Sequence, residues 1–308
     1  MAAERYAGQV RLLLSVIPEI AREEIFALKG GTAINLFLRD LPRLSVDIDL
    51  VYLPVGAREQ SLAAVRDGLA RIADRLETRM GYQVSRMLLP DGKRLIVAAD
   101  GSSIKIEVSP VLRGTVFPTE MRSVSPRVEE QFGFAEMQVV SLADLYAGKI
   151  AAALDRQHPR DLFDIHFLLE NEGIGDDLFR AFLVYLVSHP RPAHELVAPH
   201  RLDLAAQYGD EFVGMTVDEV PLEALLEARE RLVDEIQRRA SAEPAKRFLL
   251  SFHDLSPDWA AIGFGEETGE LPAVKWKLLN LERLRSDNRR KFDEQLRSLA
   301  SVVDAGAK

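Results

Sequence analysis

The stretch that most constrains the fold is residues 29–53, where two glycines precede a short apolar segment and an Asp-x-Asp motif follows. Gly30 and Gly31 leave the backbone bare, so its N–H groups can approach an anion closely. Thr32 is placed to cap the buried helix that we expect next, and a helix N-terminus behind two glycines favours phosphate binding. The stretch therefore predicts a phosphate-binding turn.

Asp47 and Asp49 lie two residues apart in the strand that we expect after Pro42. Because side chains alternate along a strand, both carboxylates face the same side. Two converging carboxylates repel each other unless a cation lies between them, and hard oxygen ligands suit Mg²⁺, with substrate phosphates completing its coordination. Alone, an Asp-x-Asp motif is more often a solvated strand edge and a Gly-Gly pair only a turn. The Gly-Gly pair followed by the Asp-x-Asp motif is a more specific signature than either motif alone.

The glycine pair followed by Asp-x-Asp resembles the signature of the DNA-polymerase-β-like nucleotidyltransferase superfamily. Arg43 and Ser45, which precede the aspartates, make the chain similar to the AbiEii/AbiGii toxin family in particular. The resemblance covers roughly residues 10–170, and beyond them only general helical character. It implies a nucleotide site built from Lys29, Gly30, Gly31, Thr32, Arg43, Ser45 and Lys149.

Glu107 lies in a strictly alternating segment, residues 103–110, on the same face as Lys105. The superfamily uses a third acidic residue on a neighbouring strand as a metal ligand or as a base toward the attacking hydroxyl. The resemblance implies that role for Glu107, beside Asp47 and Asp49. The alternative is a surface glutamate paired with Lys105. Ahead of this segment, the turn sequence Pro90-Asp91-Gly92-Lys93 predicts a hairpin.

Lys149 lies on the apolar stripe of the helix predicted over residues 141–157. A lysine directed toward packed surface needs an anion, although a lysine that extends along the surface to water is a frequent alternative. The position matches the lysine motif of the family, so the resemblance implies that Lys149 neutralises phosphate charge.

The segment Arg160-Asp161-Leu162-Phe163-Asp164 fits the Arg-Asp-x-x-Asp pattern of the family. The resemblance implies that Asp161, or else Asp164, orients Lys149 or Arg160 near the triphosphate. Spacing alone does not choose between the two aspartates. An acid in the first turn of a helix is also ordinary dipole chemistry.

Composition limits the classes of protein that fit. The chain has 308 residues, 47% hydrophobic and 28% charged, which is typical of a soluble globular protein. It has no cysteines, which excludes disulfides and thiolate metal sites. We recognise neither a signal peptide nor a membrane span, and we expect a cytoplasmic protein without membrane contact.

A basic segment stands out near the C-terminus of a chain whose net charge is −9. Its candidate RNA-contacting residues are Lys275, Lys277, Arg285, Arg289, Arg290 and Lys291. Clustered positive charge suits RNA phosphates. More often, such a run is a solvated helix face, and that alternative stays open here.

The predicted fold class is α/β (α+β), a small mixed β-sheet with flanking helices and a helical C-terminal region. We expect a nucleotidyltransferase-like core domain over residues 1–172 and a helical domain over residues 173–308. Helical periodicity in the second part predicts helices at 176–188, 194–208, 221–240, 243–254, 274–285 and 287–303.

The resemblance implies a metal-dependent nucleotidyltransferase toxin of a toxin–antitoxin or phage-defence system. It would transfer NMP from NTP to RNA, with a tRNA 3′ end as the expected acceptor, Mg²⁺ or Mn²⁺ as cofactor and a cognate antitoxin as partner. One alternative is a nucleotidyltransferase that modifies a small molecule or a protein hydroxyl. Another is a non-enzymatic relative that binds a partner.

Overall fold

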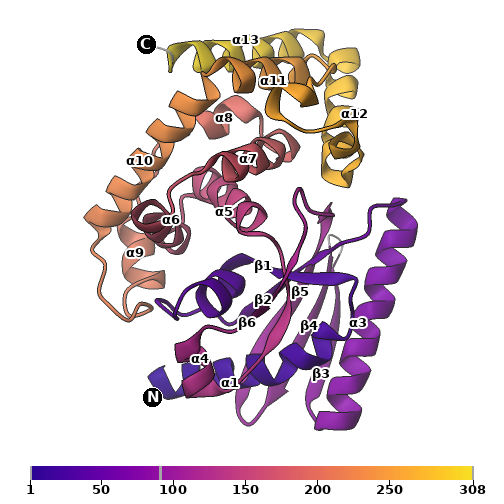
Figure 1. Ribbon diagram of the computed structural model, residues 1–308, viewed down its shortest axis with the longest axis vertical. Helices are drawn as coiled ribbons and strands as arrows, with labels where there is room; N and C mark the ends of the chain where they lie inside the picture. The colour runs from indigo at the N-terminus through magenta and orange to yellow at the C-terminus, as the bar shows by residue number, and fades with distance from the viewer. Residues whose placement is uncertain (1, 90–91, 307–308) are drawn as a thin grey trace. The chain divides into compact units, whose positions relative to one another are not determined.

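A mixed β-sheet flanked by helices, followed by a set of packed helices, makes up the computed structural model, which describes residues 2–89 and 92–306 (Figure 1). This confirms the predicted α/β class. Within the described residues, no helix is both long enough and apolar enough to span a bilayer.

The chain divides into two compact units, which are described separately. The first is Met1–Ser141 with Met215–Asp218, and the second is Leu142–Gly214 with Glu219–Lys308. This division differs from the boundary predicted between residues 172 and 173. The reason is packing: α5 (Leu142–Arg156) contacts α7 (Asp176–Ser188), and α6 (Pro159–Asn171) contacts α10 (Leu222–Ala240).

The sheet of the first unit has seven strands among the described residues, in the spatial order β3-β4-β5-β2-β1-β7-β6. The strands are β1 (Phe26–Lys29), β2 (Asp47–Tyr52), β3 (Gln83–Leu89), β4 (Gly92–Ala99), β5 (Ser102–Arg113), β6 (Glu120–Ser123) and β7 (Glu136–Val139). β2 pairs antiparallel with β1 and parallel with β5, so the sheet is mixed as predicted. β3 and β4 form the predicted hairpin, although its turn residues Pro90 and Asp91 lie outside the described residues.

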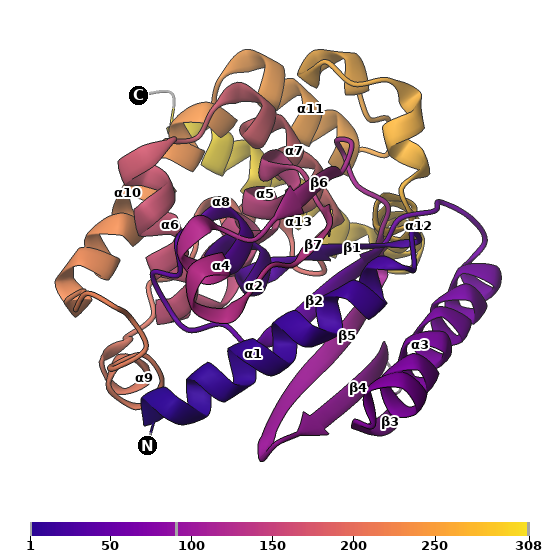
Figure 2. The ribbon, with the colours of Figure 1, turned by 60° about the horizontal axis from the view of Figure 1, so that its bottom comes forward.

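Side chains alternate between the two faces of the sheet along its central strands, and the apolar side chains lie on the face that helices cover. The helices of this unit are α1 (Ala2–Ala21), α2 (Gly30–Thr32), the π-helical η1 (Ala33–Leu38), α3 (Arg58–Met80) and α4 (Pro126–Phe132). α1 packs on β5 and β7, and α3 packs on β3 and β4 (Figure 2). Ile48 and Leu50 of β2 are fully buried, and their neighbours Asp47 and Asp49 face the other side of the sheet.

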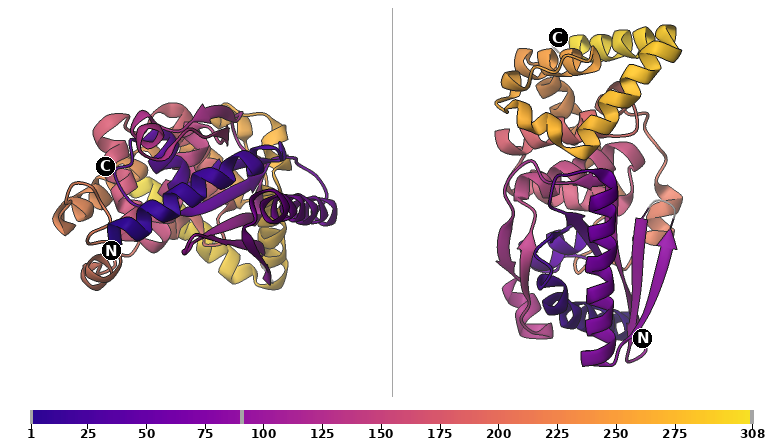
Figure 3. Two further views of the ribbon diagram at one scale, coloured as in Figure 1. Left: turned by 90° about the horizontal axis from the view of Figure 1, so that it is seen from below. Right: turned by 90° about the vertical axis from the view of Figure 1, so that its right-hand side faces the viewer.

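The second unit is helical. Besides α5, α6, α7 and α10, it contains α8 (Ala193–Val197), α9 (Ala205–Glu211), α11 (Glu243–His253), η2 (Trp259–Ile262), η3 (Glu266–Glu270), α12 (Pro272–Asp287) and α13 (Arg289–Ala305). α12 and α13 meet at a sharp corner, drawn in yellow in Figure 3. The helix predicted over 194–208 is instead two short helices, α8 and α9. Pro199 lies between them and has no N–H to continue a helix.

Candidate active site

The glycine pair joins β1 to α2 and packs against two charged side chains. Gly30 has φ +76°, and an added Cβ there would lie 2.6 Å from Oδ2 of Asp49. An added Cβ at Gly31 would lie 2.9 Å from Nη2 of Arg43. Position 30 favours glycine through its positive φ and the close Asp49 side chain, whereas at Gly31 the close atoms are the ends of the Ser45 and Arg43 side chains, which can move.

Thr32 does not cap a helix as predicted, because the helix already begins at Gly30 with Lys29 as its N-cap. Instead the buried Thr32 hydroxyl donates a hydrogen bond to the backbone oxygen of Asp47, at 2.5 Å, and lies 3.1 Å from the Ser45 hydroxyl. Thr32 therefore ties the glycine turn to the first residue of the strand that carries the two aspartates.

A row of four charged side chains crosses the sheet at Asp49. In the strand register, Asp49 lies opposite Lys29 of β1 on one side and Glu107 of β5 on the other. Glu107 in turn lies opposite Arg94 of β4. Because paired residues in adjacent strands share a face, the two carboxylates stand side by side with a cation at each end. No local sequence pattern marks Arg94 as part of this row.

Lys105 occupies the next row, opposite Asp47, and it binds two carboxylates. Its Nζ lies 2.9 Å from Oε2 of Glu107 and 3.4 Å from Oδ2 of Asp47. Arg94 also forms an ion pair with Glu107. Burial raises the pKa of Glu107, but the hydrogen bonds from Lys105 and Arg94 outweigh it and hold the pKa below its usual value. The pairing of Glu107 with Lys105 is thus observed, and its role as a third acid stays a prediction.

The donor set on this face fits a divalent cation that is shared with a phosphate ligand. Among the described residues, no three acidic or histidine side chains converge as a ready metal site. Mg²⁺ in nucleotide-dependent enzymes commonly uses only one or two carboxylates, with substrate phosphates and water filling its octahedron. Asp47, whose side chain is 49% exposed, and Asp49 supply two such carboxylates from one strand.

The loop before β2 is held by residues that are distant in the chain. Arg43 is buried and forms an isolated β-bridge with Thr216, in the short segment that returns to the first unit. The Ser45 N–H donates to the hydroxyl of Tyr6, at 3.1 Å. Sequence reasoning missed Tyr6 and Thr216, since no local pattern marks residues whose partners lie far along the chain.

Lys149, in the second unit, is bound by both aspartates of the predicted motif. Its Nζ lies 2.8 Å from Oδ1 of Asp161 and 2.9 Å from Oδ2 of Asp164, and all three side chains are buried. The interpretation of Lys149 as extending along the surface to water is therefore wrong. α5 carries the lysine and the first turns of α6 carry the acids.

Asp161 has a second cationic partner, because Nε of Arg156 donates to its Oδ2 at 2.5 Å. Burial raises the pKa of Asp161, but the Lys149 charge and the Arg156 hydrogen bond more than offset it, so the pKa falls well below its usual range. The acid is held ionised, and the cluster is a buried network of paired charges.

The basic segment near the C-terminus is less available for RNA binding than the sequence suggests. Nζ of Lys277 donates to the backbone oxygens of His189 and Arg191, at 2.6 and 2.9 Å, beyond the end of α7. Burial lowers the pKa of Lys277 to about 8. The prediction that Lys277 contacts RNA is therefore wrong, because its charge already binds backbone carbonyls.

The five other members of the predicted patch lie on α12 and α13. Lys275 forms an ion pair with Glu270. Arg289 and Arg290 pair with the acids four residues later on α13, at 2.9 and 3.4 Å. Such exposed pairs are worth little and leave the arginines accessible to another anion. Lys291 is exposed and Arg285 is partly exposed.

Comparison with known proteins finds similarity to a protein family and to solved structures. The model of the family described as "Nucleotidyl transferase AbiEii toxin, Type IV TA system" matches residues 11–278. Among solved structures, MenT4, a nucleotidyltransferase toxin from Mycobacterium tuberculosis H37Rv, is similar over 97% of this chain and 93% of its own, with a TM-score of 0.54 and 16% identity. At that identity the similarity shows the fold alone. None of the curated proteins compared with the chain matches it.

Proposed function

The chain belongs to the AbiEii nucleotidyltransferase toxin family of type IV toxin–antitoxin systems, and we propose that it transfers NMP from an NTP to the 3′ end of a tRNA in the presence of Mg²⁺ or Mn²⁺. The observation that carries the proposal is the contact between Gly30 and the Asp49 carboxylate. It places bare backbone N–H groups, suited to phosphate, beside a pair of carboxylates suited to the metal that accompanies phosphate.

The residues of the first unit divide the work of such a reaction. Asp47 and Asp49 would hold the Mg²⁺, which neutralises triphosphate charge when bound. The backbone N–H groups of Gly30 and Gly31 donate to phosphate oxygens, and Lys29 adds a positive charge beside Asp49. The acceptor hydroxyl oxygen forms a bond to the α-phosphorus while the bond from that phosphorus to the bridging oxygen breaks, and pyrophosphate leaves with the bonding electrons.

Glu107 is our candidate for a third metal ligand or for the base that takes the hydroxyl proton. It stands beside Asp49 in the same row of the sheet. Its ion pairs with Arg94 and Lys105 must open before it can take either role, since an acid with two cationic partners is a weak base.

For Lys149 the family motif supports a role at the phosphates, with Asp161 and Asp164 as positioning residues. The two carboxylates fix the ammonium group in one place. On the same ground we propose that Arg43 and Ser45 bind the nucleotide. Their backbone is fixed within the first unit by the bridge from Arg43 to Thr216 and by the hydrogen bond from the Ser45 N–H to Tyr6. We further propose that the toxin acts in the cytoplasm, in phage defence, opposed by a cognate antitoxin.

A labelling experiment tests the proposal. The purified chain is incubated with each of the four α-labelled NTPs and total tRNA, with Mg²⁺, with Mn²⁺ or with EDTA. We expect label on tRNA with metal only, and none with Asp49→Asn. Label on a protein or a small molecule instead would replace tRNA with that acceptor class. No transfer to any acceptor would contradict the proposed reaction.

We propose that tRNA is contacted by Arg285, Arg289, Arg290 and Lys291. If these side chains meet phosphates, tRNA labelling should weaken with salt, with a log–log slope of roughly −0.7 per single-stranded phosphate contact. Replacing Arg289, Arg290 and Lys291 by Ser should flatten that slope and raise the KM for tRNA, with little change in the KM for NTP. Superimposable salt series would identify the segment as a solvated helix face.

A further inference from the structure

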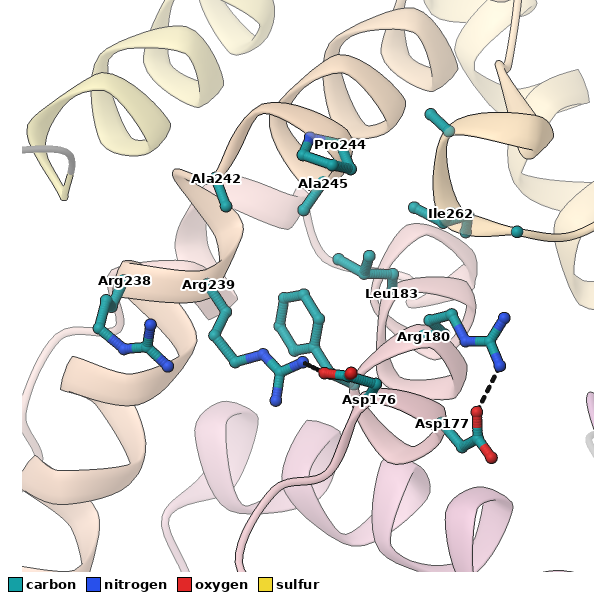
Figure 4. Close-up of a pocket in the computed structure, with 13 residues that line it drawn as sticks. Asp176, Asp177, Arg180, Leu183, Arg238, Arg239, Ala242, Pro244, Ala245 and Ile262 are labelled. Atoms are coloured by element: carbon teal, nitrogen blue, oxygen red, sulfur yellow. Dashed lines mark hydrogen bonds and ion pairs between the residues drawn. The ribbon is translucent and has the colours of Figure 1, made fainter.

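The second unit contains a cavity of about 770 Å³ that the reaction described above does not use (Figure 4). Its walls come from the first turns of α7 and α11, the last turn of α10, and the end of η2. None of its lining residues belongs to the candidate active site. Its volume lies in the range of sites that enclose a small organic ligand.

Positive charge lies inside this cavity and negative charge at its rim. The Arg239 side chain is 16% exposed, whereas its partner Asp176 is 91% exposed. In the second ion pair the arginine is again the more buried partner, because the Arg180 side chain is 34% exposed and the Asp177 side chain is 68% exposed. Water screens the two acids more than the two arginines, so the arginines contribute more strongly to the field at the buried side of the cavity.

Both arginines are held in place by groups other than their acids. The Arg239 guanidinium lies 4.3 Å from the centre of the Phe179 ring, and it also donates to the backbone oxygen of Ile174. The Arg180 guanidinium lies over the Phe264 ring, 5.4 Å from its centre. Side chains positioned in this way lose little entropy when they bind an anion.

Two helices begin at the cavity. α7 and α11 have 13 and 11 residues, and their N-cap residues, Gly175 and Ala242, make no side-chain cap. The N–H groups of a first helical turn have no partner within the helix and favour an anion. In α7, the carboxylates of Asp176 and Asp177 lie in the same first turn and offset part of the field of these N–H groups.

The remaining wall is apolar. Leu183 and Ile262 line it and are buried, as is Ala245 in the first turn of α11. Because these side chains are buried, the wall offers a ligand only a small apolar surface. The lining therefore fits a ligand with a compact anionic head and an apolar body, which removes that surface from water.

We propose that this cavity binds a small organic anion, a phosphate or carboxylate group on an apolar or aromatic body. The head lies between Arg180 and Arg239 at the start of α7, and the body lies against Leu183, Ala245 and Ile262.

Calorimetry on the full chain tests the proposal with four probes: phenyl phosphate, benzoate, inorganic phosphate and phenol. Phenyl phosphate or benzoate should bind, and whichever binds more tightly identifies the head group. Inorganic phosphate and phenol should each bind at least about tenfold more weakly than the better probe, since each lacks one half of the ligand. Raised salt should weaken binding of the charged probes.

Variants locate the site. Arg239→Gln removes the innermost charge and should weaken the better probe about tenfold or more, the scale of one charge-assisted hydrogen bond. Because Arg239 also contacts Ile174, a second variant is needed: Ala242→Trp, at an exposed lining position, should block the cavity. The matched control is Arg247→Gln, an exposed α11 arginine outside the cavity lining, which should bind like the wild type. Asp49→Asn should also bind normally.

The proposal is overturned if neither aromatic anion binds at millimolar concentration. It is also overturned if inorganic phosphate or phenol binds as tightly as the better probe. Unchanged binding in Ala242→Trp, confirmed as folded by circular dichroism, would place the ligand elsewhere, as would an equal loss in Arg247→Gln.

Discussion

The Asp49 carboxylate lies against the backbone of Gly30, so closely that a Cβ at position 30 would be 2.6 Å from its Oδ2. The contact joins the phosphate-binding turn to the carboxylate strand. It means that the backbone of Gly30 and the position of the Asp49 side chain are set together. Any side chain at residue 30 must displace one of them.

We predict that Gly30→Ala abolishes nucleotidyl transfer, because the new methyl group displaces the Asp49 carboxylate. Positive φ alone costs a non-glycine residue about 1 kcal/mol or more of folding free energy. Gly81→Ala is the matched control, since Gly81 has φ +70° with nothing within 4 Å of an added Cβ. Both variants should be less stable in urea denaturation, but only Gly30→Ala should be inactive. Normal transfer by Gly30→Ala would show that the contact is dispensable.

We expect Asp49→Asn to remove metal-dependent NTP binding while the fold survives. Asp49 stands beside Glu107 across the strands, so losing one of two adjacent negative charges relieves repulsion in the absence of metal. The melting temperature without metal should be unchanged or slightly raised. Calorimetry with Mg²⁺ and with EDTA measures NTP binding, and the wild type should bind well only with metal. A large drop in melting temperature would make Asp49 a structural residue instead.

The buried lysine cluster predicts a large effect on stability, because Lys149 neutralises two buried carboxylates. Lys149→Met should lower the free energy of unfolding by about 3–5 kcal/mol, the usual consequence of leaving a buried charge unpaired. The triple variant Lys149→Met, Asp161→Leu, Asp164→Leu should recover part of that loss. Guanidinium titrations measure all of these, and a single variant as stable as wild type would disprove the coupling.

Acid should destabilise the fold partly through Asp161. Its pKa is lowered in the folded chain, so the folded carboxylate stays ionised while the unfolded one, with a pKa of about 3.9, binds a proton. The stabilisation is therefore full above that value and is lost as the pH falls toward the folded pKa. Asp161→Asn should be less stable than wild type at pH 7, with the difference shrinking below about pH 4. A difference that stays constant from pH 7 to pH 3 would contradict this assignment.

Arg113 offers a stabilising substitution. Its side chain is 7% exposed, and neither Nε nor Nη1 has a hydrogen-bond partner among the described residues. Burial, and then the nearby charge of Arg58, lower its pKa. Arg113→Met should raise the free energy of unfolding by about 1–3 kcal/mol, the penalty of an unsatisfied buried polar group. Arg66→Met, at an exposed position of α3, is the control and should change stability by less than about 0.5 kcal/mol. A less stable Arg113→Met would imply a bound anion or water at that site.

Local periodicity predicted the parts of the fold that depend on neighbours in the chain. Strand alternation put Asp47 and Asp49 on one face and Glu107 on the polar face of its strand, and helical spacing predicted α7, α10, α11, α12 and α13 near their observed bounds. The glycine turn was also predictable from the sequence, because the positive φ at Gly30 favours glycine whatever residues lie nearby in the fold.

Charge partners were decided by tertiary structure alone. Spacing could not choose between Asp161 and Asp164 as partner of Lys149, and the packing of α6 on α5 gives it both. The sequence predicted Lys277 as an exposed basic residue, but in the structure its ammonium group donates to the backbone oxygen of His189. The sequence by itself determined which side chains share a strand or helix face, because that depends on the backbone repeat. Which opposite charge each meets depends on helices and strands brought together from far along the chain, and no local pattern encodes that.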